Sequence, residues 1–89
     1  MKIGLNRENY RSAKGDEVFL SIDDINNNAI IAFLRLRIPD NSNQSFVREL
    51  HVYGEHLNIN ESNDKAFQHK GFGRELLYEA ERITKEEYS

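Results

Sequence analysis

The sequence predicts a small α+β domain in which three antiparallel strands precede a long loop and an amphipathic helix. β-branched and aromatic runs of strand length lie before residue 54, and turn-forming residues separate them. Apolar residues then recur at helical spacing near the end of the chain. A chain of 89 residues has room for one core.

The first two strands form a predicted hairpin. Residues 1–16 are polar and without periodicity, so we expect them to be a flexible lead-in. Residues 17–22 are β-branched and aromatic, residues 23–28 are a turn rich in Asn and Asp, and residues 29–38 are again strand-like. Two strands joined by a short polar turn predict an antiparallel pair.

A third strand and a helix follow. After a loop at residues 39–45, the alternation over residues 46–53 places on one face Val47, Glu49, His51 and Tyr53. Residues 55–70 are expected to be a long polar connection. The helix has one apolar stripe that we expect to pack into the core, made of Phe72, Leu76, Leu77, Ala80 and Ile83.

The end of the helix is unusual. Glu86 and Glu87 place negative charge where the helix dipole disfavours it, and no glycine cap follows. We expect the chain to be part of a longer one, with a further strand after the helix. Without that strand, one edge of the third strand is open and predicts a dimer through strand pairing.

Composition excludes several classes of protein. The chain has no cysteine, which removes disulfides, zinc–thiolate sites, iron–sulfur clusters and thiol nucleophiles. Twelve Lys and Arg against fifteen Asp and Glu, a net charge of −3, argue mildly against a free-standing nucleic-acid binder. No apolar run is long enough for a membrane span or a signal peptide, so we expect no membrane contact and a cytoplasmic location. The three histidines lack ligand spacing, and no metal site is predicted.

A glycine motif stands at the predicted start of the helix. Gln68, Gly71 and Gly73 form the pattern Gln-x-x-Gly-x-Gly, with Lys70 and Arg74 beside it. Glycines there let a ligand approach free backbone amides, and the helix dipole favours an anion such as pyrophosphate. A glycine-rich helix start without a ligand is the alternative. The residues do not fit a dinucleotide fingerprint or a Walker loop.

The motif resembles the coenzyme A pyrophosphate motif of the GNAT acetyltransferases. Three strings over residues 17–87 more closely resemble the acetyltransferase domain of the Elongator catalytic-subunit family, which modifies the wobble uridine of tRNA: Phe33–Pro39, Arg48–Gly54 and Gln68–Gly73. The resemblance implies that residues 17–89 are a partial GNAT domain whose C-terminal strands are missing.

The resemblance also implies site residues and cofactors. The strand residues along acetyl-CoA would be Glu49, Leu50, His51 and Val52, and those at its pyrophosphate would be Gln68, Gly71, Phe72, Gly73 and Arg74. In the full-length family members, a radical domain also uses S-adenosylmethionine and an iron–sulfur cluster, which this cysteine-free chain does not bind. The resemblance implies that tRNA is bound by the full-length protein.

Acyl transfer needs a polarised thioester carbonyl and a proton acceptor. A main-chain N–H of the third strand can polarise the carbonyl if the ladder is broken there. Glu49, His51 and Tyr53 are candidate proton acceptors, with Glu49 and His51 preferred, although a Glu and a His two apart on an exposed face usually form a cross-strand polar pair. Arg35 and Arg37 alternate on the second strand and belong either to an RNA contact or to a solvated face.

Three functions fit these residues. The first is an acetyl-CoA-binding acetyltransferase domain of an Elongator-type tRNA uridine-modifying enzyme. The second is a non-catalytic module that assembles through its open sheet edge. The third is a GNAT enzyme that acetylates a protein lysine or a small amine.

Overall fold

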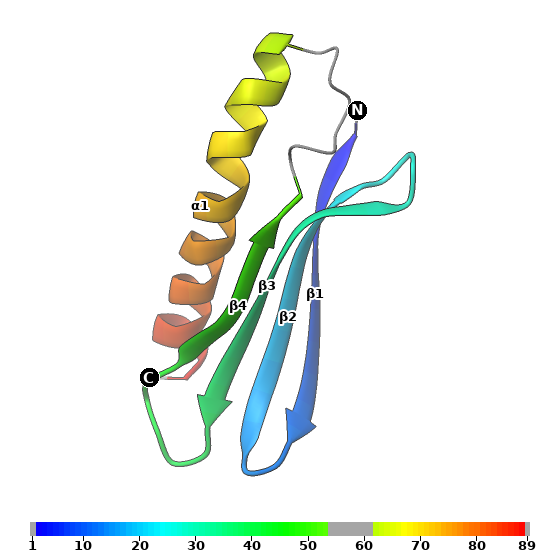
Figure 1. Cartoon of the computed structure of the whole chain (residues 1–89). Coiled ribbons are helices and arrows are strands. Elements are labelled where there is room, and N and C mark those ends of the chain that lie inside the picture. The colour runs from blue at the N-terminus through cyan, green and yellow to red at the C-terminus, as the bar shows by residue number, and fades with distance from the viewer. Residues whose placement is uncertain (1, 54–61, 89) are drawn as a thin grey trace.

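A four-stranded antiparallel sheet is covered on one face by a single helix (Figure 1). The structure, a computed structural model, describes residues 2–53 and 62–88, and for residues 62–70 the backbone alone. The elements are β1 (Ile3–Ser12), β2 (Gly15–Asp24), β3 (Ala29–Pro39), β4 (Phe46–Val52) and α1 (Ser62–Glu87). The strand order β1-β2-β3-β4 confirms the predicted α+β class and the antiparallel hairpin of β2 and β3.

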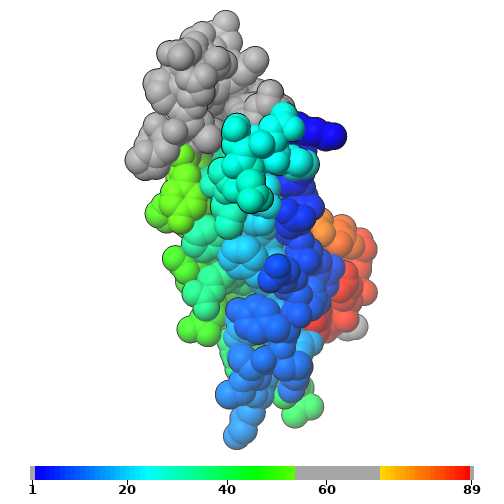
Figure 2. Space-filling view, turned by 90° about the vertical axis from the view of Figure 1, so that its right-hand side faces the viewer, coloured from blue at the N-terminus to red at the C-terminus, as the bar shows by residue number. Residues whose placement is uncertain are grey.

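The core lies between α1 and one face of the sheet. Alternate residues of β2 and β3 point toward the helix because side chains alternate along a strand. Leu76 on α1 meets Leu20 and Leu34 there, and all three side chains are fully buried. The other face of the sheet is turned away from α1; Figure 2 looks onto it, with the strands side by side from green (β4) to blue (β1).

The prediction that residues 1–16 are a flexible lead-in is wrong for their secondary structure. Residues 3–12 form β1, which pairs with β2 over its whole length. Apolar periodicity is absent because β1 is an edge strand held mainly by main-chain pairing, and its Leu5 remains half-exposed. The residue that turns the chain into β2 is Lys14, which has a left-handed φ of 58°.

The helix begins earlier than predicted. Residues 62–70 belong to α1 and not to the loop predicted over 55–70. Ser62 and Asn63 at its start are residue types that favour helix N-termini, whereas apolar repetition, the signal we used, starts only at Phe72. The first part of the predicted connection, residues 55–61, lies outside the described residues.

The last turns of α1 have a local explanation for their negative charge. Glu86 lies 3.0 Å from Arg82, and Glu87 lies 2.6 Å from Arg7 on β1. These ion pairs offset the unfavourable position of the two carboxylates in the helix dipole. The C-terminal end of α1 is thereby tied to the first strand of the sheet.

Candidate functional site: an open, bulged strand beside a glycine pair

β4 is interrupted by a bulge. Arg35 of β3 pairs with Glu49, but Leu36 pairs with Val47, so Arg48 is an extra residue in β4. A bulge of this kind leaves one residue unpaired and turns the strand locally. A main-chain N–H of this strand can polarise a thioester carbonyl only where the hydrogen-bond ladder is broken, and the break falls at Arg48.

The bulge also corrects the predicted faces of β4. Val47 lies on the helix side of the sheet with Leu36, and Arg48 lies on the open face, 3.7 Å from Glu17. The prediction that Val47 shares a face with Glu49 is therefore wrong. A strict period of two holds only from Glu49 onward, because the extra residue shifts the register by one.

The outer edge of β4 presents main-chain groups. Tyr53 N donates to Ile31 O at 2.8 Å, and the register continues through the pairs His51–Phe33 and Glu49–Arg35. In an antiparallel ladder, the residues between such hydrogen-bonded pairs direct their N–H and C=O groups away from the partner strand. These residues are Leu50 and Val52, and no described strand pairs with this edge.

The candidate proton acceptors lie on the open face beside this edge. His51 and Tyr53 are in contact, with ring centroids 4.2 Å apart. Glu49 accepts a hydrogen bond of 3.2 Å from Arg35, so the cross-strand polar pair that we considered is present. The side chains of Arg35 and Glu49 are both more than two-fifths exposed, so the carboxylate of Glu49 can still contact a ligand.

Glu17 is a buried carboxylate that sequence reasoning missed. Its Oε2 accepts hydrogen bonds from Arg37 at 2.6 Å and Ser12 at 3.0 Å, whereas Oε1 has no partner among the described residues. Burial opposes its ionisation, but the hydrogen bonds from Arg37 and Ser12 hold the pKa of Glu17 below its usual value. The cross-strand neighbour Arg37 was the available signal in the sequence, since it lies opposite Glu17 in the hairpin.

Gly71 and Gly73 lie inside α1 and not at its start. The expectation that the helix begins at these glycines is wrong for this structure, in which α1 begins at Ser62. Both glycines have helical backbone angles, and no side chain forbids a methyl group there. A Cβ on Gly71 would meet nothing within 4 Å, and one on Gly73 would lie 3.6 Å from Cγ2 of Val52.

The structure brings the glycine pair and the strand together. Because Gly73 approaches Val52, the two motifs predicted to share one ligand are neighbours in space. Phe72 between the glycines is buried in the core, and Arg74 is exposed. The side chains of Gln68 and Lys70 lie outside the described residues.

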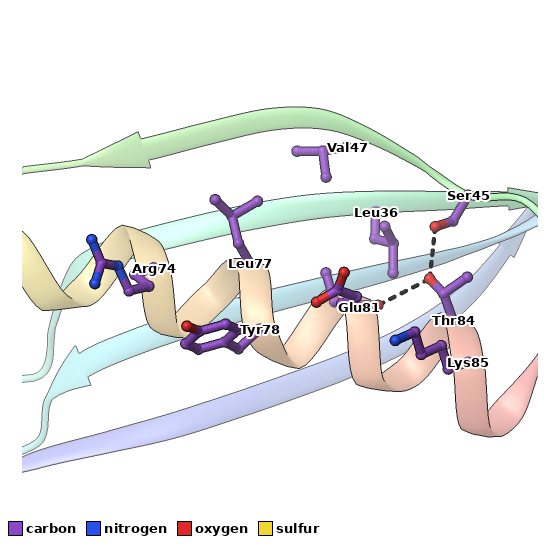
Figure 3. A pocket seen from close by; sticks show the side chains of 10 residues that line it. Leu36, Ser45, Val47, Arg74, Leu77, Tyr78, Glu81, Thr84 and Lys85 are labelled. Atoms are coloured by element: carbon purple, nitrogen blue, oxygen red, sulfur yellow. Dashed lines mark hydrogen bonds between the residues drawn. The ribbon is translucent and has the colours of Figure 1, made fainter.

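A groove runs between β4 and α1. Figure 3 shows Val47 on β4 facing Leu77 on α1, with a hydrogen bond of 2.6 Å between Ser45 and Thr84 at one end. The cavity volume is about 490 Å³. Leu77 is 44% exposed and Val47 45%, so the prediction that Leu77 packs into the core is wrong. Both side chains line the groove.

Two negative findings apply to the residues that the structure describes. Among the described side chains, those of residues 2–53 and 71–88, no cluster of three or more acidic, histidine or cysteine residues is arranged to hold a metal ion. Within residues 2–53 and 62–88, no helix has the length and apolarity needed to cross a membrane.

An antiparallel sheet whose bulged edge strand lies against a covering helix is an α+β domain. The family model described as acetyltransferase (GNAT) family matches residues 4–89, and the chain belongs to this family. The match includes β1, so the domain begins before the expected boundary at residue 17.

The chain is similar to several named proteins. It is 46% identical to the tRNA uridine(34) acetyltransferase of Methanocaldococcus jannaschii and 43% identical to Elongator complex protein 3 of Schizosaccharomyces pombe. These matches cover 97% and 98% of this chain but only 17% and 18% of the relatives. A solved structure of Methanocaldococcus infernus Elp3 superimposes with a TM-score of 0.74 at 40% identity, over 97% of this chain and 22% of that one. The predicted resemblance is confirmed, and the chain spans about a fifth of these proteins.

Proposed function

We propose that this chain is the acetyl-CoA-binding part of an Elongator-type tRNA uridine-modifying enzyme, in which acetyl-CoA is the acyl donor for wobble-uridine carboxymethylation. The observation that carries the proposal is the open main-chain edge at Leu50 and Val52 beside Gly73. The names of the similar proteins support the uridine as acceptor.

The residues present fit acetyl-CoA. Its pantetheine arm carries amides, and the free N–H and C=O groups of Leu50 and Val52 can pair with them as a neighbouring strand would. Acetyl-CoA supplies an activated acetyl group when bound. In this proposal the unpaired backbone at the Arg48 bulge stabilises negative charge on a carbonyl oxygen, and Glu49 and His51, which follow it on β4, are the proton acceptors.

Pyrophosphate binding requires free main-chain amides in α1. Inside a helix, the amides of residues 71–74 are directed at the preceding turn, so they become free only if the helix begins at Gly71. Each interior glycine weakens a helix by about 1 kcal/mol relative to alanine, and two of them lie within three residues here. We infer that the ligand-bound helix begins at the glycines, while the buried Phe72 keeps the remainder of α1 in place.

The remaining chemistry of the longer relatives belongs to parts outside this chain. Iron–sulfur clusters are held by cysteine thiolates, which this chain lacks, so we assign the cluster, and the S-adenosylmethionine used with it, to another part of the longer protein. tRNA binding by the full-length protein and a cytoplasmic location, in keeping with the cysteine-free composition, are parts of the same proposal.

Calorimetric titration with acetyl-CoA tests the proposal. The parent chain is expected to bind, and Gly73→Glu is expected to weaken binding by on the order of tenfold or more, since it places a carboxylate where the pyrophosphate would lie. Asn43→Glu adds the same charge in the exposed β3–β4 loop and is the matched control. Equal affinities of the two variants, or no binding by the parent, would refute the proposed site. Acetyl transfer to a lysine peptide but not to tRNA would favour the GNAT alternative with an amine acceptor.

A second candidate function is assembly through β4. The open edge of β4 offers main-chain groups, and the half-exposed Val47 and Leu77 offer apolar surface, for pairing with another copy of the chain. This use competes with acetyl-CoA for Leu50 and Val52. Sedimentation velocity with and without acetyl-CoA distinguishes the two, because a dimer formed through β4 should dissociate as the ligand binds.

A further inference from the structure

Aromatic rings form a stack across the open face of the sheet. Phe19 on β2, Phe33 on β3 and His51 on β4 have successive ring centroids 5.6 and 6.0 Å apart. The ring planes are nearly parallel, with interplanar angles of 25° and 9°. The rings therefore follow one another across the strands, on the face that Figure 2 shows.

The stack ends at the edge of the described sheet. β4 is the last strand in the order, so no described strand follows His51 on its outer side. Tyr53 does not occupy that position, because its ring centroid is about as far from Phe33 (6.1 Å) as that of His51 (6.0 Å). Tyr53 lies beside His51 at a 41° tilt, and His51 itself is exposed.

The next position in the stack suits a planar ring. A ring placed on the outer side of His51 would continue the spacing of the row and touch Tyr53 at its side. Base–aromatic stacking is the contact by which proteins hold unpaired RNA bases. That position stands above the sheet, whereas the edge groups of Leu50 and Val52 point sideways in its plane, so a base there and acetyl-CoA would be neighbours without overlapping.

The charges on this face favour a base over a phosphate backbone. Arg35 lies 3.2 Å from Glu49, and Arg37 and Arg48 lie 2.6 and 3.7 Å from the one carboxylate of Glu17, so each of these guanidinium groups has a carboxylate within 4 Å. Recognition through ring stacking does not need free positive charge. Of the two interpretations of Arg35 and Arg37, these ion pairs favour a solvated face over an RNA contact.

We propose that the outer face of His51, flanked by Tyr53, is the stacking position for the acceptor pyrimidine base of the RNA. The inference rests on the proposed function, because it assigns the acceptor side of the same site. It adds a stacking residue and a ligand class, an unpaired planar base, on the open face of β4.

The test compares two RNAs on the 89-residue chain. One is an anticodon stem–loop with uridine at the wobble position, and the other has an abasic site there; affinities are measured by fluorescence anisotropy. The parent is expected to prefer the uridine RNA by roughly 5- to 100-fold, the range expected for one stacked base. His51→Ala should abolish this preference and His51→Phe should retain it.

Tyr10→Ala is the matched control, since Tyr10 is an exposed aromatic residue on the same sheet face but on β1, at the opposite edge. It should leave the preference unchanged. The inference is overturned if the parent binds both RNAs equally, or if His51→Ala keeps the preference. Acetyl-CoA titration of the same samples separates the two proposals, because loss of the base preference with intact acetyl-CoA binding contradicts only the stacking position. If His51→Ala instead weakens self-association and not RNA binding, the face is a protein interface and the inference fails.

Discussion

Arg7 on β1 and Glu87, the last residue of α1, form a two-point ion pair in which Nη1 and Nη2 of Arg7 lie 2.9 and 2.6 Å from the two carboxylate oxygens. Paired hydrogen bonds of this geometry are among the stronger charged contacts. The ion pair connects β1, the least apolar of the four strands, to the C-terminal end of α1. The hydrogen bond from Arg7 lowers the pKa of Glu87.

Breaking this ion pair should have a small, measurable effect. We expect Arg7→Gln to lower the midpoint of thermal unfolding by at most a few degrees, because both side chains remain partly exposed and are screened by water. A double-mutant cycle with Glu87→Gln should show coupling in low salt that is lost in 1 M NaCl. Strictly additive effects at low salt would show that the pair contributes nothing.

Acid should destabilise the fold below the ordinary carboxyl range. Hydrogen bonds, mostly from arginines, hold the pKa values of five carboxylates below their usual values: Asp16, Glu17, Asp40, Glu79 and Glu87. A lowered pKa in the folded state stabilises the fold at pH values above the unfolded pKa of about 4, and this stabilisation is lost as pH falls through the folded pKa. Urea unfolding should therefore give a nearly constant free energy from pH 7 to about pH 5 and a decline below about pH 4.

Glu17→Gln isolates one carboxylate in that decline. The variant should be less stable at pH 7, since the buried contact to Arg37 loses its charge, and its free energy of unfolding should fall less steeply below pH 4. Glu8→Gln, which changes an exposed carboxylate on β1 that is not among the five, provides the comparison. A Glu17→Gln variant with the parent's acid slope would contradict the assignment of the low pKa to Glu17.

Replacing the helical glycines should separate stability from ligand binding. Gly71→Ala and Gly73→Ala should each raise the free energy of unfolding by about 0.5–1 kcal/mol, because both positions are helical and have room for a methyl group. The same changes should weaken acetyl-CoA binding if the ligand requires the helix to begin at Gly71. Glu75→Ala, at an exposed position of α1, is the control and should leave binding unchanged. If the alanine variants are more stable than the parent and bind acetyl-CoA with the same affinity, then α1 does not have to begin at Gly71 when the ligand binds.

The parts of the fold that the sequence predicted are those in which side-chain burial imposes a pattern. β2, β3 and the second half of α1 bury alternate or helically spaced apolar residues, and these elements were found close to their observed bounds. β1 was missed because main-chain pairing to β2 holds it and few of its side chains are buried. The first nine residues of α1 were missed because they carry no repeating apolar pattern.

The candidate site shows the same division. The alternation of Glu49, His51 and Tyr53 predicted their common face, since a period of two is a local property of a strand. The bulge at Arg48 depends on how β4 registers with β3, which no local pattern encodes. The buried pairing of Glu17 with Arg37 likewise depends on the register of the hairpin, and the glycine pattern favoured a helix start where the chain is already helical.

Leu76 and Leu77 are adjacent in α1 and should respond differently to truncation. Leu76 is fully buried against the sheet, so Leu76→Ala should lower the free energy of unfolding by about 2–5 kcal/mol through lost burial and the cavity left behind. Leu77 is 44% exposed in the groove beside Val47, and Leu77→Ala should cost less than about 1 kcal/mol. Urea unfolding of both variants at low protein concentration measures the difference. If the cost of Leu77→Ala approaches that of Leu76→Ala and grows with protein concentration, the groove is occupied in solution by a second copy of the chain, because mass action then adds the free energy of association to the apparent stability.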